Sequence, residues 1–388
     1  MATIPVKWYQ GTMQGAPNWG RSPGNFISFL DAILVNGFNS ITLTSLVVAN
    51  GIATATRTAG HGFILNQVIK IDGATLSGLN GEWRVTSIPD PTKFTFTCDG
   101  VADGTASGTI TAKTPPLGWE KVFSGTNKGV YRSPNVLSPR SFYWVDDTYS
   151  GTNGVTARVI PYCNMTDINT GTDAWVTDAL SAHVAAPYYG NTWIAVGDDR
   201  TLYLFSWGEY YSGIGVPVIR AIYWGDYDPI SPTDVEAEMI SLTNQNFYSH
   251  SLWTTQGDGF STVYNQRRLR RSELGALGGW HYGYRQLNDH SGYGGPSFPS
   301  VVDGGMMLSN AWIREEGNGY HLRGKARGTY WVLANQPFSF SNYSNGVDIT
   351  GVAGLEGRIV RILPLYYYIT GSTYYIGRIA MDITGPWG

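Results

Sequence analysis

The sequence predicts a mainly β protein, in which β-sandwich or barrel domains carry an inserted small β-module and one or two short helices. The first observation is the alternation of turn residues with β-branched and aromatic runs, as in GATLSGLNGEWRVTSIPDPTKFTFT at residues 73–97. The second is composition: 14% of the residues are charged, against about 25% in an ordinary soluble domain, and 49 glycines and 25 tyrosines are present. The third is size, because 388 residues with 42% apolar content suit two or three domains with real cores.

The first predicted element is a helix over residues 22–37. Ser22 suits the N-cap, Pro23 the first helical position and Gly37 a left-handed C-cap. Four apolar residues share one face at helical spacing, namely Phe26, Leu30, Ile33 and Leu34. A second helix is expected at residues 173–183, with 233–242 as a further candidate.

Six short strands follow, and their even spacing predicts a closed sandwich or barrel. Their expected bounds are Leu43–Val48, Ile52–Arg57, Gln67–Ile71, Glu82–Ser87, Lys93–Cys98 and Gly108–Ala112. Pro115-Pro116 marks the point where the chain returns. Residues 43–113 are therefore predicted to be a module held at both ends.

Strands also dominate the rest of the chain. Residues 193–196 and 201–205 flank the polar turn Gly197–Arg200 and predict a hairpin. Near the C-terminus, residues 365–369 and 374–379 form two runs that are apolar on both faces, joined by Thr370-Gly371-Ser372-Thr373. We expect this second hairpin to lie inside the C-terminal domain, fixed by residues 382–387.

Three domains are predicted from these elements. Residues 1–42 and 114–190 form a discontinuous N-terminal α+β platform domain. Residues 43–113 are the inserted β-sandwich or barrel module, and residues 191–388 are a C-terminal β domain.

Charge and cysteine content narrow the class of partner. The net charge is −3, so no overall field favours nucleic acid or an anionic membrane. No secretory signal is visible, and no run reaches the ~18 apolar residues that span a membrane. Cys98 and Cys163 are expected to be isolated thiols, compatible with assembly in a reducing cytosol.

No metal, cofactor or catalytic group is expected. The six histidines show no metal-ligand spacing, and Cys-x-x-Cys is absent. The acidic pairs Asp146-Asp147 and Asp198-Asp199, and Asp226-Tyr227-Asp228, are attributed to turn chemistry instead of calcium binding. Gly319–Ala326 lacks the Ser or Thr of a phosphate-binding loop, and no nucleophile elbow occurs. We therefore expect the chain not to be an enzyme.

Two groups of residues remain as candidate sites. One is the basic run Arg267, Arg268, Arg270 and Arg271, which we interpret as a loop that contacts a neighbouring subunit. The other is the aromatic set Trp207, Tyr210, Tyr223 and Trp224, close to Glu209, Asp226 and Asp228. Such a set is compatible with a β-core or interface, with sugar stacking, or with a carboxylate pair for glycoside cleavage.

Several segments resemble a family of virion proteins of tailed bacteriophages and prophages. They are KWYQGTMQGAPNWG and LDAILVNGF near the start, GLNGEWRVTSI in the module, then GWEKVFSGTNKGVYRS, WIAVGDDRTLYLF and the closing DITGPWG. The resemblance covers most of the chain and is strongest over residues 5–165. It carries no catalytic residue with it.

The resemblance implies a structural subunit of a tailed-phage particle, in the tail, baseplate or head–tail collar. Capsid decoration is the near alternative, and a receptor- or carbohydrate-binding virion protein is the rival from another class. The expected partners are other copies of the chain, other virion proteins and, for the rival, a host surface glycan. The expected location is the virion, after assembly in the bacterial cytoplasm.

Overall fold

The computed structural model describes most of the chain. The described residues are 3–20, 22–148, 156–175, 180–183, 193–210, 217–243, 265–270, 280–283, 308–316, 322–332, 346–369 and 373–387. Four antiparallel sheets and one short helical segment make up this part, so the predicted mainly β class is confirmed. No helix within it is long and apolar enough to cross a membrane.

The helical segment follows the first strand, β1 (Lys7–Gln10), and consists of α1 (Asn25–Leu30) and the π-helical turn η1 (Asp31–Asn36). The predicted apolar face is correct, since Phe26, Leu30, Ile33 and Leu34 are all fully buried. Gly37 ends the segment with φ 73°, and a side chain there would collide with the carbonyl oxygen of Thr114.

The predicted start of this helix is wrong. Gly24 occupies the N-cap position with φ 84°, and neither Ser22 nor Pro23 lies within the helix. The carboxylate of Asp147, which is distant in sequence, accepts the backbone N–H of Phe26 at 2.8 Å instead. A side chain from another element thus replaces the local cap, which helix-start patterns do not detect.

The predicted second helix is also wrong. Residues 173–183 contain the end of β14 (Thr170–Ala174) and β15 (Leu180–His183), and 233–242 leads into β20 (Glu238–Thr243). β15 pairs with β13 (Thr156–Asp167), and β20 lies between two strands of another sheet. Sheet pairing therefore overrides a weak helical pattern in both segments.

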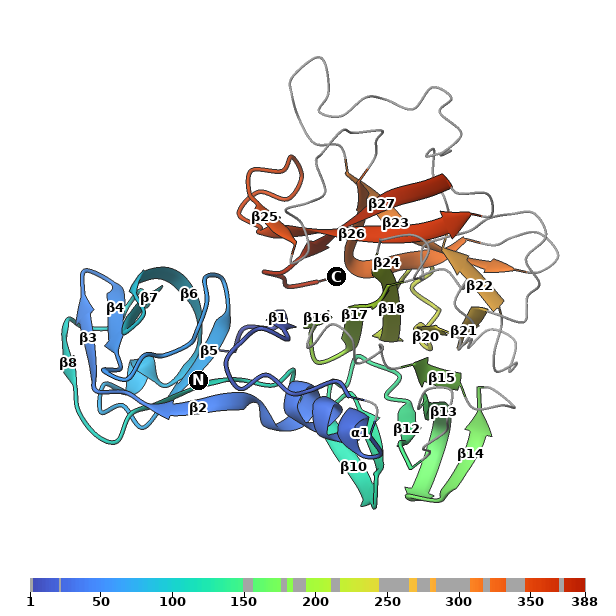
Figure 1. Ribbon diagram of the computed structural model, residues 1–388, viewed down its shortest axis with the longest axis horizontal. Coiled ribbons are helices and arrows are strands. Elements are labelled where there is room, and N and C mark those ends of the chain that lie inside the picture. Colours follow the sequence, from blue (N-terminus) through green and yellow to red (C-terminus); the bar gives the residue numbers. More distant parts are fainter. Residues whose placement is uncertain are drawn as a thin grey trace, which may run out of the picture.

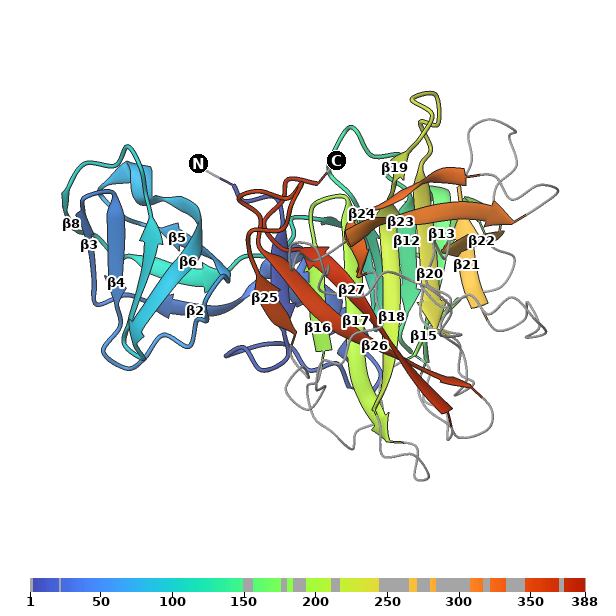
Figure 2. The same ribbon diagram turned by 90° about the horizontal axis from the view of Figure 1, so that it is seen from above.

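The module lies apart from the other sheets (Figures 1 and 2) and is an eight-stranded sheet in the order β2-β9-β5-β6-β7-β4-β3-β8. Its strands are β2 (Phe38–Thr42), β3 (Ser45–Ala49), β4 (Ile52–Thr56), β5 (Val68–Asp72), β6 (Gly81–Asp90), β7 (Lys93–Thr97), β8 (Gly104–Ala106) and β9 (Thr111–Thr114), with a 3₁₀ turn, η2, at Ser77–Leu79. β2 and β9 pair, so the chain enters and leaves at one place. Alternating residues such as Ala53 and Ala55, and Phe94 and Phe96, point into a separate apolar core.

The remaining three sheets form what we call the body. The central sheet has the order β1-β16-β17-β18-β20-β21. Its further strands are β16 (Trp193–Gly197), β17 (Thr201–Tyr210), β18 (Pro217–Asp226) and β21 (Asn265–Leu269). β16 and β17 pair directly across residues 198–200, which confirms the predicted hairpin.

A second body sheet, in the order β10-β11-β12-β13-β14, has β15 added to β13. Its first strands are β10 (Glu120–Gly125), β11 (Lys128–Arg132) and β12 (Phe142–Asp146). The third sheet, in the order β22-β23-β24-β27-β26-β25, has β19 (Asp228–Pro229) added to β24. Its strands are β22 (Trp280–Gly283), β23 (Leu308–Glu316), β24 (Leu322–Val332), β25 (Val347–Ile349), β26 (Val360–Ile369) and β27 (Thr373–Asp382).

The C-terminal hairpin is formed as predicted, by β26 and β27. β25 pairs with residues 360–362 of β26, and β24 pairs with residues 379–381 of β27, so both outer edges are covered at the base of the hairpin. Beyond β27, Asp382 Oδ1 accepts the backbone N–H groups of Thr384 and Gly385, and the Trp387 indole donates to the Asp382 carbonyl at 2.9 Å. The chain end is thereby fixed to the sheet.

One hydrophobic cluster runs through the body from Val6 to Trp387. β1 contributes to it beside β16, although the two are far apart in sequence. The segments assigned by sequence to the platform and C-terminal domains therefore share a core. The three domain boundaries themselves stay a prediction.

A small set of polar contacts joins the module to the body. Lys7 of β1 and Glu82 of β6 form an ion pair at 3.1 Å, and both side chains are buried. The indole of Trp8 donates to the carbonyl of Asn66 in the module at 2.9 Å, and the Asn66 amide donates to Asp348 of β25. The N-terminal strand is thus clamped between the module and the C-terminal sheet.

Candidate functional site

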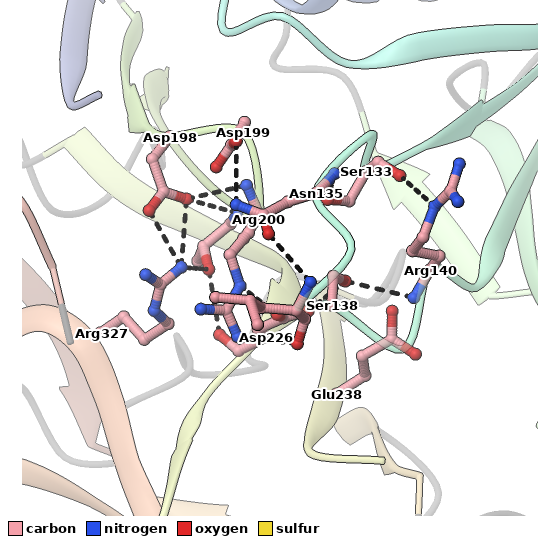
Figure 3. Close-up of polar contacts among 12 residues, drawn as sticks. Ser133, Asn135, Ser138, Arg140, Asp198, Asp199, Arg200, Asp226, Glu238 and Arg327 are labelled. Atoms are coloured by element: carbon pink, nitrogen blue, oxygen red, sulfur yellow. Dashed lines mark hydrogen bonds and ion pairs between the residues drawn. The ribbon is translucent and has the colours of Figure 1, made fainter. Parts of the chain in front are cut away.

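A set of buried and half-buried charges from several sheets lies in the body, and Figure 3 shows part of it. We call it the acid–arginine cluster; its members are Asp198, Asp226, Asp228, Glu238, Arg200, Arg270 and Arg327. Asp198 and Arg200 lie in the β16–β17 turn, Asp226 ends β18, and Asp228 begins β19. Glu238 begins β20, Arg270 follows β21, and Arg327 lies on β24. Elements that are distant in sequence are thereby tied together.

Asp198 shapes the turn between β16 and β17. Its Oδ1 atom accepts the backbone N–H groups of Arg200 at 2.9 Å and Thr201 at 2.8 Å. This is the turn role that the sequence predicted for the Asp198-Asp199 pair. Burial raises the pKa of Asp198, while the charge of Arg327 acts in the opposite direction.

Arg327 is the cation that neutralises this turn. Its guanidinium lies 2.9 Å from Asp198 and 3.2 Å from Asp228, and it donates to the carbonyl of Trp387 at 2.8 Å. Burial lowers the pKa of Arg327, but the charges of Asp198 and Asp228 outweigh this and leave it raised. Arg327 of β24 therefore connects the β16–β17 turn and β19 with the end of the chain.

Asp226, at the end of β18, is fully buried. Its carboxylate accepts the Arg200 Nε–H at 2.6 Å and the Ser138 hydroxyl at 2.8 Å. Burial, and next the charge of Glu238, raise the pKa of Asp226 to about 7, although Arg200 opposes the shift. The Asp226 carboxyl is therefore harder to ionise than a solvent-exposed aspartate.

Glu238 is the second buried carboxylate of this pair. It accepts the backbone N–H of Ser141 at 3.1 Å and the Ser141 hydroxyl, and Arg270 lies 3.2 Å away. Burial raises the pKa of Glu238, and the contacts with Ser141 and Arg270 oppose this shift. Ser138 and Ser141 thus connect one loop to both carboxylates.

The cluster is arranged to hold elements together. Its buried carboxylates and guanidinium groups already pair with one another or with backbone groups, and a general acid or nucleophile needs a face open to its substrate. No group of three or more His, Cys, Asp or Glu side chains in the described part is placed to hold a metal ion. This geometry supports a structural role, in which hydrogen bonds and ion pairs hold the sheets together.

The predicted arginine site is only partly described. Arg267 and Arg268 lie on β21, but their side chains fall outside the described residues, as does Arg271. Arg270 is buried and pairs with Glu236 at 2.8 Å and with Glu238. Its guanidinium is therefore used within the chain, and the expected contact of the basic run with another subunit stays a prediction.

The predicted sugar-stacking set is corrected for two of its members. Tyr223 and Trp224 are both 0% exposed, so neither ring has a free face. Trp224 instead stacks on Tyr143, with ring centroids 5.7 Å apart, and Tyr223 packs edge-on against Tyr203. Trp207 and Tyr210 lie on β17, and their side chains are outside the described residues.

Sequence reasoning drew attention to Asp198, Asp226 and Asp228 but missed their partners. Glu238, Arg327, Ser138 and Ser141 carry no local signal, because each is an isolated polar residue in a strand or loop. Alternation does not identify Glu238 or Arg327, since residues 237–240 are all buried and Arg327 directly follows the buried Ala326. No signal in the sequence could therefore have found these partners.

Comparison with known proteins gives little beyond this geometry. No family model and no curated protein matches the chain. Among solved structures, the chain is similar to a phage phi92 endosialidase at 12% identity and a TM-score of 0.18, over 89% of this chain and 52% of that one. The chain therefore spans about half the length of that protein, and a likeness at this TM-score carries no argument about fold or activity.

Proposed function

We propose that the chain is a structural component of a tailed-bacteriophage virion that acts through subunit–subunit assembly. Its place in the particle would be the tail, the baseplate or the head–tail collar. The structural observation behind the proposal is the exposure of the neighbouring apolar side chains Val136 and Leu137, because subunit contacts bury such side chains. The acid–arginine cluster holds the sheets of one chain together. The resemblance of several segments to tailed-phage virion proteins supports the same function.

A virion position also suits the low charge of the chain. Only 14% of the residues are charged, and the described part exposes large apolar side chains such as Val136 and Val235. Assembly with other subunits buries apolar surface that a free monomer leaves in contact with water.

The proposal is tested on the particle itself. Antibody raised against the purified chain, or a gold-labelled affinity tag in the phage gene, should decorate one symmetric position on intact particles in electron micrographs. Label at the tail, baseplate or collar supports the proposal, and label over the capsid shell supports the decoration alternative. Particles without label, from a lysate that contains the chain, would contradict both.

Solution behaviour distinguishes the carbohydrate-binding rival. Light scattering on the purified chain should show a defined oligomer, and a glycan array should show no binding. Glycan binding that is lost in Trp207→Ala and Tyr210→Ala variants would instead favour the receptor-binding rival. These two residues are the informative ones, because Tyr223 and Trp224 are buried.

A further inference from the structure

The described part of the body exposes large apolar side chains in one region. We call them the aliphatic surface; they are Val136, Leu137, Ile230, Val235 and Leu322. The first two are 84% and 74% exposed and lie in the loop of residues 133–141, between β11 and β12. The next two are 54% and 70% exposed and lie in the segment of residues 230–237, between β19 and β20, and the last is 45% exposed at the start of β24.

Hydrogen bonds place the loop 133–141 beside the segment 230–237. The Ser138 hydroxyl donates to Asp226 at 2.8 Å, and the backbone N–H of Ser141 donates to Glu238 at 3.1 Å (Figure 3). The loop therefore contacts the chain on both sides of the segment. In Figure 2 the two loops project from the same side of the body, next to β19.

The start of β24 lies beside the same segment. The backbone N–H of Ile230 donates to the carbonyl of Arg323 at 2.9 Å, and the Arg323 guanidinium lies 3.6 Å from Asp234. Leu322 directly precedes Arg323 in the sequence. The five side chains of the aliphatic surface therefore lie on neighbouring elements.

Both loops that carry this surface are ordered by hydrogen bonds. In the first, the backbone N–H of Leu137 donates to the Asn135 side chain at 2.9 Å. In the second, the backbone N–H of Asp234 donates to the Ser231 carbonyl at 3.1 Å, and the buried Tyr227 hydroxyl donates to the Asp234 carboxylate at 2.8 Å. A surface that is fixed before it binds loses little conformational entropy on association.

The charges around the aliphatic surface already have partners within the chain. The ion pairs are Arg140–Glu120, Arg200–Asp226, Arg270–Glu236, Arg323–Asp234 and Lys325–Asp228, and Asp199 accepts the Asn135 amide. A strongly charged partner, such as a nucleic acid or an anionic membrane, therefore gains little from these side chains. The surface fits another apolar surface with paired charges, and a second copy of this chain presents one.

The size of the aliphatic surface suits one partner. A fully exposed aliphatic side chain offers roughly 60–120 Å² of apolar area, so the five together offer roughly 200–400 Å². A standard interface buries ~800 Å² on each partner, of which about 57% is non-polar. The five side chains thus supply about half or more of the apolar area that one such interface needs on each side.

We propose that two copies of the chain pair through their aliphatic surfaces about a two-fold axis. This pairing rests on the proposed function and names a partner for it. In a two-fold contact the same surface serves both chains, so each exposed side chain is buried in both copies. The pair is then a building unit for assembly.

Analytical ultracentrifugation of the purified full-length chain over a series of concentrations tests the pairing. The chain should pass from monomer to dimer as its concentration rises. Leu137→Ser and Val235→Ser, which lie on different loops, should each raise the dissociation constant about tenfold or more, because each change removes an apolar side chain from both copies. Val47→Ser is the matched control, since Val47 is an exposed aliphatic side chain in the module, and it should leave the dissociation constant unchanged.

Thermal melting shows whether each variant is folded, and the melting temperatures should match that of the unmodified chain because the replaced side chains are exposed. A chain that stays monomeric throughout the series, or that forms a trimer or larger ring, would overturn the pairing. So would a dimer that neither Leu137→Ser nor Val235→Ser weakens, or that Val47→Ser weakens equally. Label at the tail, baseplate or collar would still support the proposed function in these cases, whereas unlabelled particles contradict that function even if the chain dimerises.

Discussion

The module and the body have different kinds of interior. The module, from β2 to β9, encloses an apolar core of side chains such as Leu46, Ile69 and Phe94, and Glu82 at its junction is its only buried charged residue among those described. Of its own described residues, the body buries ten others: Lys7, Asp147, Asp198, Asp226, Asp234, Glu238, Arg270, Arg327, Arg361 and Asp382. A continuous chain segment closes the module, whereas the body joins segments that are far apart in sequence.

This difference indicates how each region achieves a unique structure. In the module, alternation along consecutive strands is sufficient to choose register and face. In the body, several sheets meet at their ends, and a paired charge fixes which ends meet because a mismatched arrangement leaves a charge buried and unpaired. We therefore expect the module to tolerate changes in charge and the body to depend on them.

Removal of residues 371–388 should have the largest effect. It deletes β27, which lies between β24 and β26, and the Trp387 carbonyl that Arg327 binds. We expect the truncated chain to be insoluble, while limited proteolysis with mass spectrometry still recovers a resistant fragment that contains residues 38–114. Soluble truncated chain that assembles like the full-length chain would show that the hairpin is dispensable.

Replacement of Arg327 by Met should destabilise the body strongly. The change leaves Asp198 buried without its cation, and breaking a buried pair in this way costs about 3–5 kcal/mol. Urea unfolding should show the loss. The control is Lys93→Met in the module, an exposed residue whose substitution should change stability by less than about 0.5 kcal/mol. Equal effects of the two changes would remove the distinction between the regions.

The fold and the cluster differ in how far the sequence predicts them. The predicted strand Ile52–Arg57 is observed at Ile52–Thr56, and Lys93–Cys98 at Lys93–Thr97, because turns and alternation are local features. The Asp147 cap on α1 and the Arg327–Asp198 pair join residues more than one hundred positions apart. No local pattern encodes such a pair, since it depends on how the sheets pack.

The two cysteines show the same division. Both are free, as predicted, because two thiols in a long chain seldom pair. Their surroundings were not predictable from spacing: Cys98 lies in the module core, and Cys163 is half-buried against the hydrophobic cluster of the body. The surroundings of a residue therefore depend more on the element that packs against it than on its neighbours in the sequence.

The isolated module, residues 38–114, should fold by itself. Trp83 is the only tryptophan in this segment and stacks on Phe96 with ring centroids 5.2 Å apart, so its fluorescence reports the fold. Phe94→Ala should lower the free energy of unfolding of the isolated module by about 3–5 kcal/mol, because a fully buried ring is lost. An isolated module without a cooperative transition would contradict the prediction that this part of the chain is self-contained.

Stability should depend on pH with opposite sign in the two regions. Burial raises the pKa of Asp226 to about 7 and that of Asp147 to about 6 in the folded body, so the folded state binds more protons and stability falls as pH rises through this range. Burial lowers the pKa of His61 in the module, so the folded module binds fewer protons at this residue than the unfolded one. The stability that the neutral His61 contributes is therefore lost as pH falls below about 6.5.

Urea unfolding of the full chain and of the isolated module measures both trends. From pH 5 to 7 the full chain should lose about 2 kcal/mol through Asp226, and the module should gain a smaller amount. Asp226→Asn in the full chain and His61→Gln in the module should each flatten the corresponding trend. A module that loses stability toward pH 7, as the body does, would show that its interior does not differ in this respect.

The smallest effect is expected at the junction, where the two kinds of interior meet. Lys7 and Glu82 form a buried pair at 3.1 Å, and Glu82 also accepts the backbone N–H of Ile4 at 2.9 Å. In the double variant Lys7→Met with Glu82→Gln, the amide oxygen still accepts from Ile4 and no charge is left buried. We expect a change within about 1 kcal/mol, because replacing both members of a buried pair is often neutral. Lys7→Met alone should cost more, since it leaves the Glu82 carboxylate without its cation. A double variant as unstable as that single variant would mean that the charges themselves hold the module to the body, as they hold the sheets of the body together.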